Sequence, residues 1–236
     1  MGAFLLNCAI AVGALLLYLG CQFLLSFCMT LVSQIAYMIQ NPMATYDEVY
    51  AFCDEFILAH QCFALLFSAL FTFLLLWAYF KARNLSPIEE LHAPKRKFFH
   101  ILLFMFFGTA LSYAIGFLVA IIPWPETWLS VYEAESSELM QGEGIVLQFL
   151  TLVISGPILE EVIFRGMMQS YLEKSMPAVL AAAIQCIIFG LVHGTPLWMC
   201  YTFVFGVILT ICNKKTGSLW TSIAMHIGFN LVALLP

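Results

Sequence analysis

The chain has 236 residues, of which 63% are hydrophobic and only 10% are charged, and its mean hydropathy is +0.96. A soluble domain of this size carries about 25% charged residues because its surface faces water, so most of this surface must face lipid instead. The formal net charge is -5, and no loop gathers enough Lys and Arg for a basic groove, which argues against nucleic acid as a partner. We therefore expect an integral membrane protein in contact with the lipid bilayer.

Seven apolar stretches approach the length of about 20 residues that a membrane-spanning helix needs. In chain order they cover residues 5–32, 62–80, 98–122, 144–164, 177–194, 197–212 and 218–235. The first apolar run continues to about residue 38, which predicts one tilted helix with an extension rather than two spans. The predicted fold class is all-α, a polytopic transmembrane helical bundle of about seven spans.

The loops between these stretches differ in charge. All nine basic residues lie in 81–97, 165–176 and 213–217, whereas the acidic stretches 39–61 and 123–143 contain no Lys or Arg. Lys and Arg near the ends of spans favour the cytoplasmic side of the membrane. We therefore expect the N-terminus and the three basic loops in the cytoplasm and the acidic stretches outside.

A short helix on the outer surface is predicted within residues 124–143. Trp124 and Trp128 lie beside two prolines at the end of the third stretch, and tryptophan rings prefer the level of the lipid headgroups. The chain leaves the membrane at this point.

The first polar cluster lies near the predicted cytoplasmic end of the fourth stretch. Charged side chains inside bilayer helices cost at least about 2.5 kcal/mol, so they indicate functional sites by default. Glu161 and Arg165 are four residues apart and can pair across one helical turn, which leaves Glu160 without a built-in partner. Two adjacent carboxylates of which one is neutralised can supply a poised general base. The alternative is a glutamate pair that reaches the cytoplasmic interface beside Arg165.

Two further polar clusters follow. His193 lies late in the fifth stretch, with Phe189 one turn earlier on the same face as a possible wall of the site. In the seventh stretch, His226 and Asn230 are four residues apart and face one direction. A packed histidine and a hydrogen-bonded pair between helices are the structural alternatives. Together, however, the three clusters hold more polar groups than helix packing requires, and they predict acid–base chemistry in a polar intramembrane cavity.

The three clusters form an ordered set of motifs: E-E-x-x-x-R at Glu160, Glu161 and Arg165, F-x-x-x-H from Phe189 to His193, and H-x-x-x-N from His226 to Asn230. This set resembles the motifs of the CAAX protease and bacteriocin-processing family of intramembrane peptidases, which includes the Ras-converting CAAX endopeptidases. The resemblance covers residues 98–236, which we expect to form the CAAX-protease-like core. Residues 1–97 carry none of it and are expected to form peripheral transmembrane helices and loops.

The resemblance implies an intramembrane glutamic endopeptidase with a conical cavity. Glu160 would activate the attacking water, with His193 positioning or deprotonating that water. His226 and Asn230 would stabilise the negative charge that develops on the scissile carbonyl oxygen.

Glu161 and Arg165 would support this catalytic set. Two His and one or two Glu also satisfy a zinc site by ligand type, so a metallopeptidase is an alternative. However, the chain has no H-E-x-x-H helix, and the adjacent Glu160 and Glu161 cannot both face one ion well. We therefore expect no metal cofactor.

The depths of the two histidines are difficult to reconcile with this site. With about 1.5 Å of rise per residue, His193 lies about 24 Å above the cytoplasmic start of its stretch, but His226 lies only about 12–14 Å above residue 217. The two histidines can reach the same depth and share one site only if the fifth helix is tilted or begins deeper in the membrane.

The substrate class implied by the resemblance is a small peptide precursor or the C-terminal end of a membrane-associated protein. We expect the enzyme in a bacterial plasma membrane, with a cytoplasmic N-terminus. A non-proteolytic bacteriocin immunity or scaffold protein and a small transporter are the alternatives. The intact motifs argue against the former, and the lack of paired broken helices argues against the latter. Nothing in the sequence sets the oligomeric state or shows a prenyl pocket.

Overall fold

The computed structural model describes residues 2–141 and 143–234, and these residues form helices and no β-strand. Five helical stretches are long and apolar enough to cross a membrane. They are α1 (Gly2–Gln40), α3 (Gln61–Ala82), α5 (Phe98–Ile121), the continuous stretch Ile145–Glu173 and α11 (Pro196–Thr216). The all-α polytopic membrane bundle expected from the sequence is confirmed.

Two further apolar helices are shorter. α10 covers Ala178–Leu191, and α12 covers Leu219–Leu231 and continues into the 3₁₀ helix η3 at Val232–Leu234. The seven apolar elements follow the seven predicted stretches in order, although residue 235 lies outside the described residues. Because α10 has 14 residues and a span needs about 20, the count of seven membrane crossings stays a prediction.

The other helices lie in the polar segments between the apolar ones: α2 (Tyr46–Ala59), α4 (Pro87–Glu90) and α6 (Glu126–Leu139). α2 begins at a capping box, in which the Thr45 backbone N–H donates to the Glu48 carboxylate and the Glu48 backbone N–H donates to the Thr45 hydroxyl. The hydrogen bonds from the backbone and hydroxyl of Thr45 hold the pKa of Glu48 below its usual value. α6 confirms the short helix predicted within residues 124–143.

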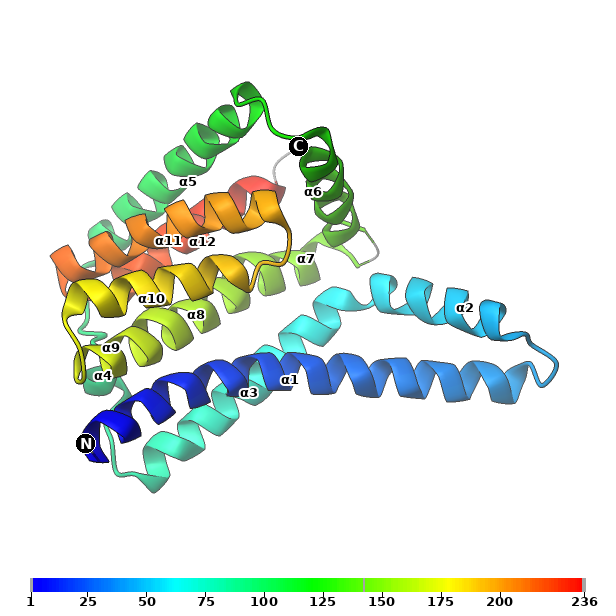
Figure 1. Cartoon of the computed structure of the whole chain (residues 1–236), viewed down its shortest axis with the longest axis horizontal. Coiled ribbons are helices and arrows are strands. Elements are labelled where there is room, and N and C mark those ends of the chain that lie inside the picture. Colours follow the sequence, from blue (N-terminus) through cyan, green and yellow to red (C-terminus); the bar gives the residue numbers. More distant parts are fainter. Residues whose placement is uncertain (1, 142, 235–236) are drawn as a thin grey trace.

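The stretch Ile145–Glu173 is the central helix of the bundle. In its most apolar part 44% of the residues are buried, against 11% in α5, which faces lipid along most of its surface. Its successive segments are α7 (Ile145–Gln148), η1 (Phe149–Ser155), α8 (Gly156–Glu161), η2 (Val162–Gln169) and α9 (Ser170–Glu173). α1, α3, α10 and α12 pack against this central helix. Figure 1 shows that α1 extends past the end of the bundle, where α2 runs back along it.

Two glycines bring α5 and α12 into close contact. A Cβ atom at Gly108 would lie 1.8 Å from the carbonyl oxygen of Met225, and one at Gly228 would lie 2.0 Å from the carbonyl oxygen of Met105. The Thr109 hydroxyl also donates to the carbonyl oxygen of Gly228, at 2.9 Å. Small residues allow membrane helices to approach closely, so these positions fix the distance between α12 and α5.

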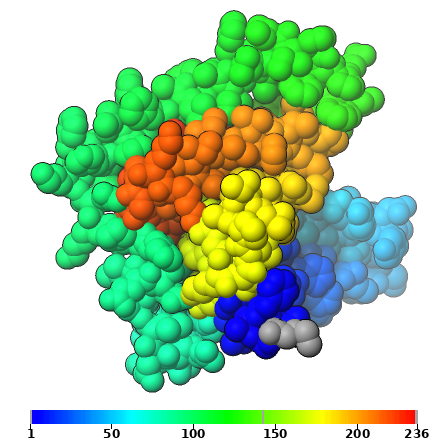
Figure 2. All heavy atoms as spheres, turned by 60° about the vertical axis from the view of Figure 1, so that its left-hand side comes forward, coloured from blue at the N-terminus to red at the C-terminus, as the bar shows by residue number. Residues whose placement is uncertain are grey.

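The segments that carry the exposed basic residues meet at one end of the bundle. Their contacts are the ion pair of Lys174 with Glu90, the ion pair of Lys214 with Glu173, and the bond from Arg96 to the carbonyl oxygen of Thr216. Figure 2 brings this end forward and shows the start of α1 beside the start of α10, with the segment before α5 next to the turn between α11 and α12. We call it the basic end.

The acidic segments meet at the opposite end of the bundle, which we call the acidic end. There the Gln61 side chain donates to the carbonyl oxygen of Glu138, and the Glu143 carboxylate accepts a hydrogen bond from the Phe63 backbone N–H. These contacts join the start of α3 to the end of α6. The alternation of charge predicted from the loops therefore corresponds to two ends of one bundle.

The predicted end of the fourth span is wrong. The sequence predicted a span at 144–164 and placed Arg165 in a cytoplasmic loop, but the helix continues to Glu173 and Arg165 is only 2% exposed. The two glutamates therefore lie near the middle of the helix, not near its cytoplasmic end. The physical reason is that the charge of Arg165 is neutralised by a neighbour on the same helix, so the side chain does not need water.

The orientation in the membrane can be tested with epitope tags. A tag inserted after Pro42, at the acidic end, is expected to bind antibody on intact cells, because the basic end should face the cytoplasm. A matched tag after Asn84, at the basic end, should bind only after permeabilisation. The reverse pattern would show that the bundle is inserted the other way round.

Candidate active site

The central helix carries a buried ion pair. Arg165 Nη1 lies 2.7 Å from Glu161 Oε1, and both side chains are fully buried. Nη2 of Arg165 donates to the carbonyl oxygen of Gly206 on α11 at 3.1 Å, and its guanidinium carbon lies 4.2 Å from the centroid of the Phe189 ring on α10. The pairing predicted from the four-residue spacing is thus present, and it also ties the central helix to α10 and α11.

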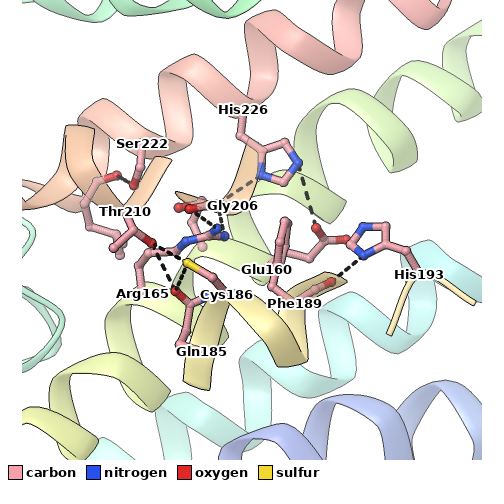
Figure 3. Close-up of polar contacts among 12 residues, drawn as sticks. Glu160, Arg165, Gln185, Cys186, Phe189, His193, Gly206, Thr210, Ser222 and His226 are labelled. Atoms are coloured by element: carbon pink, nitrogen blue, oxygen red, sulfur yellow. Dashed lines mark hydrogen bonds and ion pairs between the residues drawn. The ribbon is translucent and has the colours of Figure 1, made fainter. Parts of the chain in front are cut away.

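His226 on α12 lies between the two carboxylates. Its Nδ1 is 3.0 Å from Glu161 Oε1, and its Nε2 is 3.8 Å from Glu160 Oε2. Figure 3 shows the ring with one nitrogen directed toward Glu160 and the other toward the ion pair that contains Arg165. Because an ionised carboxylate only accepts hydrogen bonds, Nδ1 of His226 is the donor to Glu161. Glu161 is therefore held by both Arg165 and His226, whereas Glu160 contacts His226 only at the longer distance and has no Arg or Lys partner.

His193 lies in the turn after α10, beyond the end of the helix at Leu191. Its Nδ1 is 2.6 Å from the carbonyl oxygen of Phe189. A carbonyl oxygen only accepts, so Nδ1 carries the proton of the neutral ring and Nε2 is left with a free lone pair. The predicted fifth span, 177–194, was therefore too long at its end, and the helix stops before the histidine.

The predicted difference in depth does not separate the two histidines. The centroid of the Phe189 ring lies 4.9 Å from that of His193 and 6.1 Å from that of His226. The side chain of His193 turns back toward the carbonyl of Phe189, one helical turn earlier. Both rings thus share one aromatic neighbour.

Asn230 lies one turn after His226 on α12 and lines the same cavity. Its Nδ2 donates to the carbonyl oxygen of Leu152 in η1 at 2.9 Å. An amide nitrogen carries two hydrogens, so one remains for a further acceptor. The side chain is therefore oriented by the central helix without being fully occupied.

A cavity of about 690 Å³ joins the predicted residues. This volume falls within the range of roughly 300–1,000 Å³ that is usual for ligand sites. Its lining includes Glu160, Phe189, His193, His226 and Asn230. The buried ion pair of the central helix lies outside the lining, behind His226. The structure therefore brings five of the seven predicted residues to one cavity. The other two, Glu161 and Arg165, lie behind the cavity wall and contact it through His226 and Phe189.

Tyr18 on α1 is a cavity residue that sequence reasoning missed. Its hydroxyl lies 3.5 Å from Glu160 Oε1, its ring packs edge-on against Phe164 at 6.2 Å, and the residue is 8% exposed. Residues 1–97 were expected to be peripheral, yet this one reaches the central carboxylate. The available signal was a phenol in the middle of an apolar run, since a buried tyrosine hydroxyl needs a partner.

Gly206 on α11 was also missed. A Cβ atom at this position would lie 2.9 Å from the Phe189 ring and 3.2 Å from Arg165 Nη2. The absence of a side chain thus allows the guanidinium to reach the carbonyl oxygen of Gly206. The sequence around it gives no signal for this role, because a glycine in a membrane helix is common.

The glutamates lie on a short α-helical segment between two wider ones. α8 separates η1 and η2, both of which are π-helical. Pro157, at the start of α8, has no backbone N–H and therefore cannot donate the regular helical hydrogen bond. The chain has a π-helical turn directly before this position. Such π turns within helices are frequent at functional sites. Pro157 therefore lies at a change of winding within a continuous helix.

In residues 2–141 and 143–234, no group of three or more His, Cys, Asp and Glu side chains is arranged to hold one metal ion. Of the residues in the zinc alternative, Glu161 and His226 are bonded to each other, and Nδ1 of His193 is bonded to the backbone.

The buried ion pair should dominate stability at this site. Arg165→Met leaves the Glu161 charge buried without its partner and is expected to lower the free energy of unfolding by about 3–5 kcal/mol. The double variant Glu161→Gln with Arg165→Met should recover part of this stability because neither charge remains. The midpoint of thermal unfolding in detergent measures both effects.

Lys174→Met is the matched control, since it removes an ion pair whose lysine is 42% exposed and should cost less than about 1 kcal/mol. Equal losses for the Arg165 and Lys174 variants would contradict the importance of burial.

Comparisons with known proteins find similarity over part of the chain. Residues 142–232 match the family described as Type II CAAX prenyl endopeptidase Rce1-like, and this segment contains all three motifs. A Bacillus subtilis (strain 168) protein named "Putative membrane peptidase YdiL" is 27% identical over 93 residues, which make up 39% of this chain and 38% of that protein. No solved structure is significantly similar. The resemblance predicted from the motifs is thus confirmed: the segment 142–232 is similar to the CAAX protease and bacteriocin-processing family.

Proposed function

We propose that this protein is an intramembrane endopeptidase whose general base is Glu160. The observation that carries the proposal is the unequal environment of the two adjacent carboxylates. Glu161 is buried against Arg165 and bonded to His226, whereas Glu160 lines the cavity with no Arg or Lys beside it. The family match and the relative named as a membrane peptidase support proteolysis in general.

In this mechanism a water molecule binds between Glu160 and His193. Glu160 takes a proton from the water while the water oxygen attacks the carbonyl carbon of the scissile peptide bond. Nε2 of His193 accepts a hydrogen bond from the other O–H group of the water and so orients the water. The protonated Glu160 then delivers its proton to the leaving amine nitrogen, which breaks the carbon–nitrogen bond and restores the carboxylate.

The tetrahedral intermediate places a negative charge on the former carbonyl oxygen. Nε2 of His226 and the free amide hydrogen of Asn230 are the proposed donors to this oxygen. Because Nδ1 of His226 already donates to Glu161, Nε2 can donate only when the ring is an imidazolium.

Tyr18 acts in this scheme as a positioning residue. Its hydroxyl donates to Oε1 of Glu160, which directs Oε2 toward His226 and the cavity. The phenol therefore restricts the rotation of a carboxylate that would otherwise be free on that side.

The proposed substrate is a small peptide precursor or the C-terminal end of a membrane-associated protein, and the enzyme works within a bacterial plasma membrane. The cavity walls are mostly apolar and aromatic, which suits a peptide that partitions into lipid.

The decisive test is cleavage of a mixed peptide library by the purified protein in detergent. Glu160→Gln is expected to lower the rate by about 10²–10⁴-fold because it removes the general base, while Glu89→Gln at the basic end should leave the rate unchanged. Excess chelator should have no effect on the wild-type rate.

Loss of cleavage with chelator and its recovery with zinc would instead establish the metallopeptidase alternative. If a folded wild-type protein cuts no peptide and Glu160→Gln binds partners equally well, the immunity or scaffold role gains support.

Removal of the Tyr18 hydroxyl tests its positioning role. Tyr18→Phe is expected to lower kcat about 2- to 10-fold with little change in KM, since one hydrogen bond of about 0.5–1.5 kcal/mol is lost while the ring remains. Tyr37→Phe is the control on the same helix, because Tyr37 packs against Phe52 far from the cavity. An unchanged kcat in Tyr18→Phe would remove Tyr18 from the mechanism.

A further inference from the structure

The charges of the chain are divided between its two ends. Nine of the 14 acidic residues lie in segments 41–61 and 123–143, which contain no Lys or Arg, and these segments form the acidic end. Eight of the nine basic residues lie at the basic end, and the ninth is the buried Arg165. The potential outside the acidic end is therefore negative over a wide area.

The cavity lies in the half of the bundle next to the acidic end. α3 and α11 begin at this end and line the cavity with their first halves, whereas α5 and α12 end there and line it with their second halves. α6 closes this side with Tyr132, Ser136 and Leu139. A substrate that approaches from the acidic end meets α6 first.

The cavity walls favour apolar and aromatic side chains over anionic groups. Tyr132 packs edge-on against Trp198 and Tyr201, at 6.2 and 6.1 Å between ring centroids, and the three rings form one wall. No Lys or Arg is found among the described lining residues, and the one carboxylate there is Glu160. An acidic side chain would therefore enter beside the Glu160 carboxylate and without a Lys or Arg to pair with, which is costly in an apolar site.

Two glutamates border the wall formed by α6. At about 100° per residue, Glu133 and Glu135 lie on opposite sides of the face that carries Tyr132 and Ser136. Glu133 is exposed and Glu135 is half-buried. Neither has an ion-pair partner among the described residues. Both charges therefore lie beside the side chains of α6 that line the cavity and are not neutralised by an ion pair.

We propose that the substrate is a peptide segment in which the apolar stretch to be cut is flanked by Lys or Arg, and that α6 recruits it through Glu133 and Glu135. This inference rests on the proposed function of the cavity and names its substrate class. The apolar stretch fills the aromatic cavity, and the flanking cations remain at the acidic end, beside Glu133 and Glu135. Opposite charges raise the rate of encounter and suppress partners of the wrong sign.

The test uses three peptides with one apolar core, flanked by Lys pairs, Gln pairs or Glu pairs. In a non-ionic detergent at low salt, kcat/KM of the purified protein should be about 10-fold higher for the Lys peptide than for the Glu peptide. At 1 M salt, where screening shortens the range of charge interactions to about 3 Å, the ratio should approach one. The Gln peptide should lie between the two.

The variant Glu133→Gln with Glu135→Gln should reduce this preference to about 2- to 3-fold at low salt and leave kcat on the Gln peptide unchanged. The matched control is Asp54→Asn with Glu55→Gln, which removes the same charge from the acidic end but lies on α2, a helix that contributes no residue to the cavity lining. Its preference should stay within about 2-fold of the wild type. Equal effects of the two double variants would overturn the role of α6.

Peptide binding separates this inference from the proposed function. Fluorescence anisotropy of the labelled peptides with Glu160→Gln measures the preference without cleavage. Preferred binding of the Lys peptide, lost in the α6 variant, would support the inference even if the wild-type protein cuts no peptide. Equal or tighter binding of the Glu peptide would overturn it, whatever the rate of cleavage.

Discussion

The buried ion pair between Glu161 and Arg165 is the interaction on which the site depends. Two charges in an apolar bundle are tolerated only when they pair with each other and with further hydrogen-bonding groups. Here the guanidinium also reaches the Gly206 carbonyl and the face of Phe189, and the carboxylate also accepts from His226. One pair on the central helix thereby sets the positions of α10, α11 and α12, and it leaves Glu160 as the carboxylate that faces the cavity.

The three motifs are insufficient to form the cavity by themselves. α12 reaches its place because two glycines bring it against α5, and Glu160 has a hydrogen-bonding neighbour from α1 at Tyr18. Both α1 and α5 lie before the segment that matches the family. The wall at the acidic end comes from α6, which also precedes that segment. The proposed chemistry therefore lies in the family segment, and the proposed selection of substrate lies largely outside it.

Burial and charge occupy separate regions of this molecule. The central helix carries the compensated pair of Glu161 with Arg165 and one carboxylate, Glu160, that faces the cavity without an Arg or Lys partner. Most other charges collect at two ends of opposite sign. This division follows from the cost of an unpaired charge in lipid and from the preference of Lys and Arg for one side of the membrane. The apolar cavity next to the acidic end is a consequence of that division, and it is the basis for the substrate class proposed above.

The sequence by itself determined the all-α membrane bundle, the order of its apolar helices, the opposite charges of its loops and the pairing of Glu161 with Arg165. These features depend on composition or on residues within one helical turn, and both can be read along a single chain. It could not show that Arg165 lies inside the central helix, that His193 follows the end of α10, or that His226 contacts both carboxylates. For Tyr18 it offered only a phenol within an apolar run and did not identify Glu160 as its partner. Those features depend on contacts between helices distant in the sequence, where packing, and not local periodicity, decides which side chains meet.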